Sequence, residues 1–333
     1  RRLMSAHSNI AVFVPHLGCK HRCSFCNQNH ITGCHSQVKA EDVDEAVKIA
    51  LKSKNYDPEN SEIAFFGGSF TAIDKSYMIK LLKAAYKYVL SKETAGIRIS
   101  TRPDAIDTEI LDTLKSYGVT SIELGAQSMK DGVLNANNRG HSAEDVYKAS
   151  ELIKAYGFSL GLQMMTGLYK SSESDELYTA EKFAEIRPKT VRIYPTVTLK
   201  NTELEKRFYE KEYFPPSLDD SVKLCARLFT YFTERGIKVI RLGLHSIEPD
   251  SYVAGPWHPA FSELCQSEII LKEIKDRLKE KGKYIIYVNN SFVSKAIGQK
   301  KSNIIELKNS GYDCKVKCDP NLEKHEIKIE RCG

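Results

Sequence analysis

The stretch that decides the fold is NIAVFVPHLGCKHRCSFC, residues 9–26. A β-branched apolar run, Ile10–Val14, leads directly into Cys19, Cys23 and Cys26, which are spaced Cx3Cx2C. Three thiolates on one short loop can bind three irons of a 4Fe–4S cluster and leave the fourth iron open to another ligand. The alternative is a structural zinc ion, which needs four ligands. Four nearby residues could supply the fourth zinc ligand: His16, His21, Cys34 and His35.

Beyond this loop, the chain alternates apolar runs with amphipathic stretches as far as about residue 245. The runs predict seven strands: Ile10–Val14, Ile63–Phe66, Ile97–Ser100, Ser121–Leu124, Ser159–Gln163, Val191–Tyr194 and Val239–Leu242. The amphipathic stretches predict helices: Ala40–Leu51, Lys75–Leu90, Thr108–Tyr117, Ala143–Tyr156, Asp175–Ile186 and Asp219–Arg235. Repeated strand–helix units predict an α/β fold, a partial (β/α)6 barrel of the TIM type with parallel strands. Ligands of such sheets bind at the carboxyl ends of the strands.

The composition is that of a globular protein. Among 333 residues, 41% are hydrophobic and 28% are charged. No run of about 18 apolar residues predicts a membrane span, and the N-terminus lacks the apolar core of a signal peptide. We therefore expect a cytoplasmic protein whose nine cysteines do not form a disulfide framework.

A second candidate binding segment, Phe65-Phe66-Gly67-Gly68-Ser69-Phe70, ends the second predicted strand. Glycine lets a backbone approach a ligand closely and offers carbonyl groups without side-chain hindrance. A pair of glycines alone is more often a simple turn. Its place after a strand, 41 residues beyond Cys26, favours ligand binding here.

Together these features resemble the radical S-adenosylmethionine (SAM) enzymes, in which an aromatic residue, here Phe25, often precedes the last cysteine. The resemblance implies that the open iron chelates the amino and carboxylate groups of SAM. An electron from a donor such as flavodoxin or ferredoxin then cleaves SAM to methionine and a 5′-deoxyadenosyl radical. It also implies that Gly67, Gly68 and Ser69 contact the methionyl amino group.

Further segments are similar to the radical SAM domain of the Elongator catalytic subunit family, and partly to oxygen-independent coproporphyrinogen oxidases. They are Arg98–Asp104, Ile122–Ser128, Asn138–His141, Arg192–Thr196 and Thr202–Leu204. The resemblance covers roughly residues 9–245. It implies that Gln127, Arg139 and Gln163 contact the SAM ribose and carboxylate, with Ser100 and Thr101 as weaker candidates. The alternatives without a ligand are that Arg139 forms a surface salt bridge and that Gln127 is a buried amide with hydrogen-bond partners inside the protein.

Two departures limit this resemblance. Elongator catalytic subunits space their cysteines more widely, and they carry an acetyltransferase domain. Only 88 residues follow residue 245 in this sequence, too few for that domain. The resemblance therefore predicts the radical but not its target.

The C-terminal part predicts a small separate unit. Residues 1–245 form the barrel, the proline-containing residues 246–266 a connector, and residues 267–333 a basic βααββ unit. In that unit, helix Ser267–Lys281 is followed by strand Tyr284–Val288, helices Phe292–Ile297 and Ser302–Asn309, and strands Cys314–Cys318 and Glu326–Glu330. The segment around Gly298, Lys300 and Lys301 resembles the loop with which KH domains clamp nucleic-acid backbone.

The charge of this unit supports the same interpretation. Residues 266–333 carry fifteen Lys and Arg against ten Asp and Glu, a net charge of +5. An RNA-binding domain is favoured, and a small cap on the barrel with a solvated surface is the alternative. Cys314 and Cys318 would lie about 13 Å apart along one strand, too far to share one ion.

The sequence thus predicts a radical SAM enzyme, a transferase that modifies RNA, and tRNA in particular. One alternative is a radical SAM enzyme acting on a small molecule such as a tetrapyrrole or on a protein. Another is a non-catalytic iron–sulfur regulator that binds RNA. No residue is predicted for the substrate step. Tyr194 could lie near the substrate, but a buried tyrosine at a strand end is more often part of the core.

Overall fold

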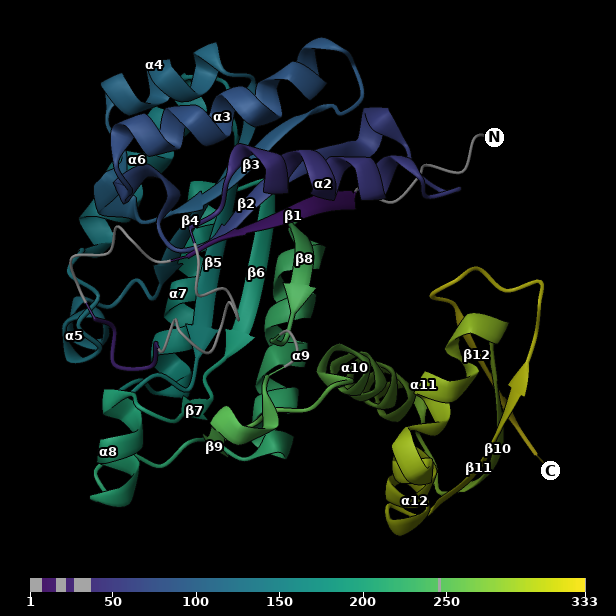
Figure 1. The fold of residues 1–333 in the computed structure, drawn as a ribbon. Helices are drawn as coiled ribbons and strands as arrows, with labels where there is room; N and C mark the ends of the chain where they lie inside the picture. The colour runs from purple at the N-terminus through teal and green to yellow at the C-terminus, as the bar shows by residue number, and fades with distance from the viewer. Residues whose placement is uncertain (1–7, 16–21, 27–36, 245–246, 333) are drawn as a thin grey trace.

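A computed structural model describes residues 8–15, 22–26, 37–244 and 247–332. It shows a large curled sheet wrapped by helices and a small sheet with its own helices (Figure 1). Seven parallel strands form the large sheet in chain order: β1 (Ser8–Val14), β2 (Ser61–Gly67), β3 (Gly96–Thr101), β4 (Val119–Gln127), β5 (Ser159–Thr166), β6 (Thr190–Pro195) and β8 (Lys238–Leu242). All seven apolar runs are therefore confirmed as strands, one more than a six-unit barrel requires.

Helices cover the convex face of this half-barrel. They are α2 (Ala40–Leu51), α3 (Lys75–Leu90), α4 (Thr108–Ser116), α6 (Ala143–Ala155), α7 (Glu173–Ile186) and α9 (Leu218–Glu234), whose buried apolar side chains share the large core. Two shorter helices lie outside that core: α5 (Asp131–Ala136), whose Val133 packs with Phe25, and α8 (Glu203–Tyr209), which packs against the short strand β7 (Thr198–Leu199). Three of these helices end as the sequence pattern Tyr117-Gly118, Tyr156-Gly157 and Arg235-Gly236 predicts, because Gly118, Gly157 and Gly236 follow α4, α6 and α9 with positive φ angles. Among the described residues, no helix is long and apolar enough to cross a membrane.

Period-two alternation along the strands separates two environments. In β2 and β3, Ile63, Phe65, Ile97 and Ile99 are fully buried in the core shared with the helices. The residues between them point to the concave side, where polar and charged groups collect. The half-barrel therefore has an apolar outer layer and a polar inner surface that can serve as a site.

One helix differs from its prediction. The helix expected to begin at Ser267 begins at Phe261, as α10 (Phe261–Arg277). Its first part, with Phe261 and Cys265, is buried in the core of the half-barrel, and its second part, with Ile270 and Ile274, in a second core. The last six residues of the expected connector are thus part of α10, because apolar residues on one helix reach both cores.

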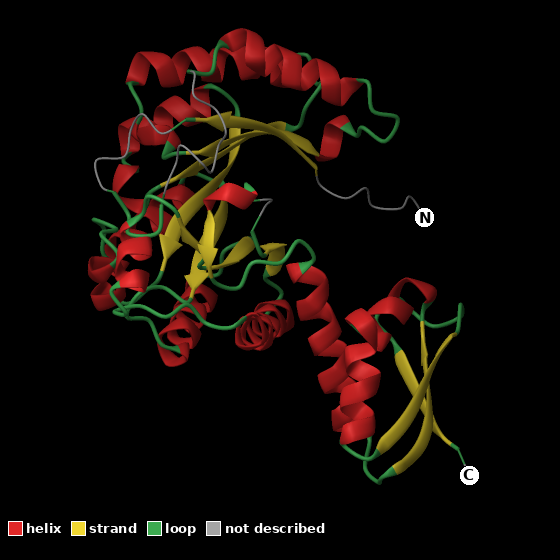
Figure 2. Ribbon diagram, turned by 60° about the horizontal axis from the view of Figure 1, so that its bottom comes forward, coloured by secondary structure: helices red, strands yellow, loops and turns green. Residues whose placement is uncertain are grey.

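The second core belongs to the predicted βααββ arrangement. Its elements are β10 (Gly282–Val288), α11 (Val293–Ile297), α12 (Ser302–Asn309), β11 (Tyr312–Cys318) and β12 (Ile327–Arg331). Strand β10 is central, parallel to β11 and antiparallel to β12. In both views the helices lie between this small sheet and the half-barrel (Figures 1 and 2).

Candidate active site

A network of ion pairs crosses the middle of the concave face. Arg98 on β3 donates from Nε to Glu62 Oε2 on β2 at 2.8 Å and from Nη1 to Glu123 Oε1 on β4 at 2.7 Å. Glu123 also pairs with Arg192 on β6, where Nε lies 2.5 Å from Oε2. Burial alone would raise the pKa of Glu62, but Arg98 and two hydroxyl donors lower it overall. Each charged group of the network therefore has an oppositely charged partner, although Glu123 Oε2 and Arg192 Nε pair by charge without hydrogen-bond geometry, and the network joins four strands.

A second polar layer lies nearer the carboxyl ends of the strands. Gln127 ends β4 with φ +68°, where the pairing of β4 with β5 shifts register. Arg139 donates from Nη2 to the Gly125 carbonyl at 2.5 Å and from Nη1 to Cys23 Sγ at 3.1 Å. A Cβ atom on Gly125 would lie 3.2 Å from Gln127 Nε2 and 3.6 Å from Arg139 Nη2. Glycine therefore keeps space open between these two side chains.

This second layer is not satisfied by the described protein atoms. Gln127 Oε1, Arg139 Nε and His141 Nδ1 are buried without a hydrogen-bond partner among the described residues. Burial and the neighbouring Arg139 lower the pKa of His141 to about 4, so its ring is neutral at pH 7. Buried polar atoms in folded proteins almost always have partners. The layer is therefore shaped to hold a polar ligand.

The cysteine segment lies against this layer. Cys23 is buried, and its carbonyl accepts a hydrogen bond from the Cys26 N–H at 3.1 Å, which makes a tight turn. Phe25 packs in a small apolar cluster with Val133, Met165, Leu168 and Tyr194. Cys19, His16, His21, Cys34 and His35 lie outside the described residues. The structure thus places Cys23 against Arg139, with Cys26 in the same turn of chain.

The structure explains why glycine is needed at Gly67, which the sequence alone did not reveal. Gly67 has φ +111°, and a Cβ atom there would lie 2.4 Å from the Val14 carbonyl oxygen at the end of β1. The Gly68 N–H donates to that same oxygen at 3.2 Å. Ser69 Oγ bonds to Thr101 Oγ1 at 2.9 Å and accepts from the Arg102 N–H. Glycine is needed because β1 passes so close to β2 just before the cysteine loop.

Other predicted residues lie at different levels. Gln163 on β5 stands in register with Arg192, at the level of the ionic network. Among the described residues it shares no hydrogen bond with Gln127 or Arg139. Tyr194 lies beside Phe25, and its hydroxyl accepts from Arg192 Nη1 at 3.3 Å. Sequence reasoning missed Arg102, which donates to the Arg139 carbonyl and to Asp104, because only the fold brings these segments together.

The predicted RNA loop lies between α11 and α12. Gly298 (φ +79°), Lys300 (φ +52°) and Lys301 (φ +65°) all have positive φ angles, and both lysines are exposed. In the same small unit, Cys314 is buried whereas Cys318 is exposed. Within the part of the chain that the structure describes, no three His, Cys, Asp or Glu residues form a metal site.

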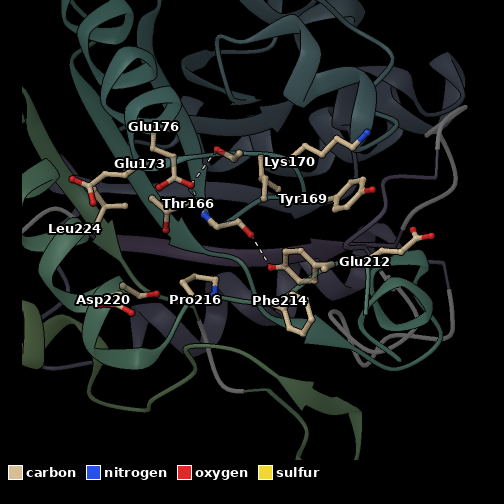
Figure 3. A pocket seen from close by; sticks show the side chains of 15 residues that line it. Thr166, Tyr169, Lys170, Glu173, Glu176, Glu212, Phe214, Pro216, Asp220 and Leu224 are labelled. Carbon is tan, nitrogen blue, oxygen red and sulfur yellow. Dashed lines mark hydrogen bonds between the residues drawn. The ribbon is translucent and has the colours of Figure 1, made fainter. Parts of the chain in front are cut away.

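A cavity of about 470 Å³ opens between the first turns of α7 and α9 (Figure 3). Glu176 lines it and accepts from the Gly167 N–H at 2.5 Å, while Tyr213 donates to the Gly167 carbonyl at 2.7 Å. Burial raises the pKa of Glu176 to about 7. Neither Gln127 nor Arg139 lines this cavity, which is therefore distinct from the unsatisfied layer. The sequence predicted nothing here.

Comparison with known proteins identifies the family. The family model described as the radical SAM superfamily matches residues 13–183, more than half of the chain. The chain belongs to the radical SAM superfamily. A model of the radical SAM C-terminal domain matches residues 188–270. The chain is therefore an enzyme, and its cofactors are a 4Fe–4S cluster and SAM, which decides against zinc and against a purely regulatory protein.

Individual relatives are more distant. An uncharacterized protein of Methanocaldococcus jannaschii is 25% identical over 279 residues, which cover 80% of this radical SAM chain and 83% of that protein. The tRNA uridine(34) acetyltransferase of Dehalococcoides mccartyi is 27% identical over 247 residues, covering 64% and 54%. Human Elongator complex protein 3 is 29% identical over 198 residues, covering 54% and 36%. The chain thus spans about half or less of these two named relatives, and the predicted resemblance to the Elongator family is confirmed.

Solved structures support the fold. An archaeal Elp3 of Methanocaldococcus infernus with an N-terminal deletion superposes with a TM-score of 0.66 at 20% identity, covering 88% of this chain and 68% of that one. The predicted partial barrel of the radical SAM type is therefore confirmed. The unsatisfied Gln127, Arg139 and His141 atoms fit the superfamily's cofactors, because a polar ligand held there would meet one buried donor, Arg139 Nε, and two buried acceptors, Gln127 Oε1 and His141 Nδ1. Arg139 also contacts the Cys23 sulfur.

Proposed function

We propose that the chain is a radical SAM transferase that modifies tRNA. The observation that carries the radical chemistry is the unsatisfied layer around Gln127 and Arg139, directly beside Cys23. The tRNA substrate is supported by the relatives of the chain, among them two tRNA uridine(34) acetyltransferases. Since the chain spans only part of those proteins, the modification itself need not be theirs.

The roles of the individual residues are part of this proposal. Cys19, Cys23 and Cys26 hold the cluster, and the bound cluster and SAM together supply a carbon radical that abstracts hydrogen. Arg139 orients the SAM carboxylate with its guanidinium. The Gln127 amide bonds the ribose hydroxyls. The rest of the SAM site is lined by Phe25, Gly67, Gly68, Ser69 and Gln163. A flavodoxin or ferredoxin supplies the electron.

The RNA contact is assigned to the small C-terminal unit. Helix α12 starts after Lys301 without a side-chain cap, so the positive end of its dipole faces the loop, although the Ser302 N–H donates to the Gln299 carbonyl. Lys300 and Lys301 add positive charge at the same point, and Gly298 supplies a backbone conformation that other residues avoid. We propose residues 1–245 as the catalytic part and residues 267–333 as the RNA-docking part, with residues 246–266 as the connector. Helix α10 crosses the boundary between the connector and the RNA-docking part.

Nucleoside analysis tests the function directly. Mass spectrometry of tRNA nucleosides from cells with and without the gene should show one modified nucleoside missing in its absence. The reconstituted, reduced protein should release 5′-deoxyadenosine from SAM, and the Cys23→Ala variant should not. If 5′-deoxyadenosine forms but the tRNA nucleosides are identical, the substrate is a small molecule or a protein and the tRNA proposal is wrong.

Salt-dependent binding tests the RNA contact. Removal of two phosphate contacts by the double variant Lys300→Ala/Lys301→Ala should weaken tRNA binding and reduce the slope of log K against log salt by about 2. The control is Lys52→Ala/Lys54→Ala, which removes the same charge from two exposed positions on the half-barrel. Equal weakening in both variants would show that only the total charge matters, and the loop assignment would be wrong.

A further inference from the structure

Ser24 lies between Cys23 and Cys26 and is completely buried. Its N–H donates to the Asn137 carbonyl at 3.2 Å, and its hydroxyl donates to Asn137 Oδ1 at 2.7 Å. Its carbonyl accepts from the Leu204 N–H at 2.8 Å. All three polar groups of Ser24 are therefore bonded to distant parts of the chain. The cysteine segment is held by the body of the enzyme.

Asn137, directly after α5, is also completely buried. Its Nδ2 donates to the Val133 carbonyl at 2.8 Å and to the Tyr169 carbonyl at 2.9 Å. Because those two acceptors need the amide nitrogen, the amide oxygen must face the Ser24 hydroxyl. A carboxylate at this position could still accept from Ser24, but it would meet two carbonyl oxygens without a proton to donate.

The same turn of chain reaches Cys23 itself. Two residues after Asn137, Arg139 donates to Cys23 Sγ at 3.1 Å. Asn137 and Arg139, two residues apart in the chain, thus bond to two neighbouring residues of the cysteine segment, Ser24 and Cys23. A segment that is ordered beforehand loses less conformational entropy when it binds its ligand. Partners that orient metal ligands in this way commonly change metal affinity by about 10- to 100-fold when they are removed.

We propose that Asn137 is a positioning residue that acts through Ser24 to hold Cys23 and Cys26 in the geometry that binds the cluster. Asn137 is bonded to neither cysteine. The inference rests on the assignment of these cysteines as cluster ligands in the proposed function. The expected effects are on the rate of iron loss and on the electronic environment of the cluster. These effects are separate from any change in the stability of the fold.

Iron retention in the full-length protein is the test. After anaerobic reconstitution, the Asn137→Asp and Ser24→Ala variants should each lose iron to a chelator at least about tenfold faster than the wild type. The electron paramagnetic resonance spectrum of the reduced cluster should also change in line shape. The double variant should lose iron no faster than the more severe single variant, because both changes disrupt the same link between Ser24 and Asn137. Ser24→Ala is the gentler change and keeps the test open if Asn137→Asp does not fold.

Leu114→Ala is the matched control, since Leu114 is fully buried in α4 and its loss destabilises the fold through the apolar core. Iron loss from Asn137→Asp at the rate of Leu114→Ala, at equal stability without the cluster, would overturn the proposal. So would independent, multiplying effects of Ser24→Ala and Asn137→Asp. The ligand assignment is tested separately, because Cys23→Ala should hold no complete 4Fe–4S cluster; a complete cluster there would remove the basis of the inference.

Discussion

Two polar layers of the half-barrel lie one above the other and differ in how their groups are paired. In the ionic network, Glu62, Arg98, Glu123 and Arg192 each have an oppositely charged partner, and the pairs cross four strands. In the layer nearer the carboxyl ends, Gln127 and Arg139 keep buried atoms without a hydrogen-bond partner among the described residues. Both layers are polar and buried, but strand alternation places only the ionic network, since Arg139 lies in the segment after α5. The difference in pairing separates groups that hold the sheet together from groups that await a ligand.

The comparison has a consequence for stability and binding. A paired buried network contributes to the fold, and removal of one member leaves another charge buried alone. An unpaired layer is a cost to the unliganded fold that its ligand offsets. Substitutions in the first layer should therefore change unfolding, whereas substitutions in the second should change the affinity for SAM.

The largest effect is expected at the centre of the paired network. Glu123→Leu leaves Arg98 and Arg192 without their shared carboxylate and should cost about 3–5 kcal/mol of unfolding free energy. Denaturant unfolding measures it. The control is Glu109→Leu, which breaks the exposed pair with Lys75 and should cost less than about 1 kcal/mol. Similar costs for both variants would mean that water reaches the network.

A pH dependence is expected from the unpaired layer. The pKa of His141 falls from 6.5 to about 4 on folding, so the folded state binds the proton less well than the unfolded state. Its contribution to stability is complete above pH 6.5 and is lost as pH falls towards 4, by about 3 kcal/mol in total. Unfolding of the cluster-free protein, compared with His141→Gln, measures this loss. A constant difference between the two proteins from pH 7 to pH 4 would contradict it.

A binding effect is expected at Arg139. Arg139→Lys keeps the charge but loses the planar fork, and it should weaken SAM binding by about 10- to 100-fold. Equilibrium dialysis of the cluster-loaded protein gives the affinity, and its iron content serves as control because Arg139 also contacts Cys23. Unchanged affinity at full iron content would show that the unpaired guanidinium atom does not serve SAM.

The smallest effect is expected at Gln127. Gln127→Ala removes one neutral amide and should weaken SAM binding by about 2- to 12-fold, which corresponds to about 0.5–1.5 kcal/mol. The same dialysis experiment measures it. A loss of unfolding free energy as large as that of Glu123→Leu would place Gln127 with the structural layer instead.

The large sheet could be predicted strand by strand from the sequence. Seven apolar runs became seven strands, and glycines such as Gly157 and Gly236 stopped helices as expected, because both signals are local. The start of α10 was predicted six residues late. Its first turns are set by packing of Phe261 into the half-barrel core, and no local pattern reports that contact.

The candidate site could be predicted only in part. Arg139 and Gln127 were predicted from the resemblance, and the structure brings both side chains close to Gly125. Gln163, found in the same way, stands at the level of the ionic network. Ser24 and Asn137 were missed, because a serine and an asparagine 113 positions apart carry no shared signal.

By itself, the sequence determined the order of strands and helices, the cysteine spacing and the family, since each depends on neighbouring residues or on a motif. Only the tertiary structure decided which polar groups are paired, that Gly67 must clear the Val14 carbonyl, and that Asn137 meets Ser24. The physical reason is range. Backbone periodicity acts over a few residues, whereas a buried hydrogen bond is made by whatever the fold brings within about 3 Å.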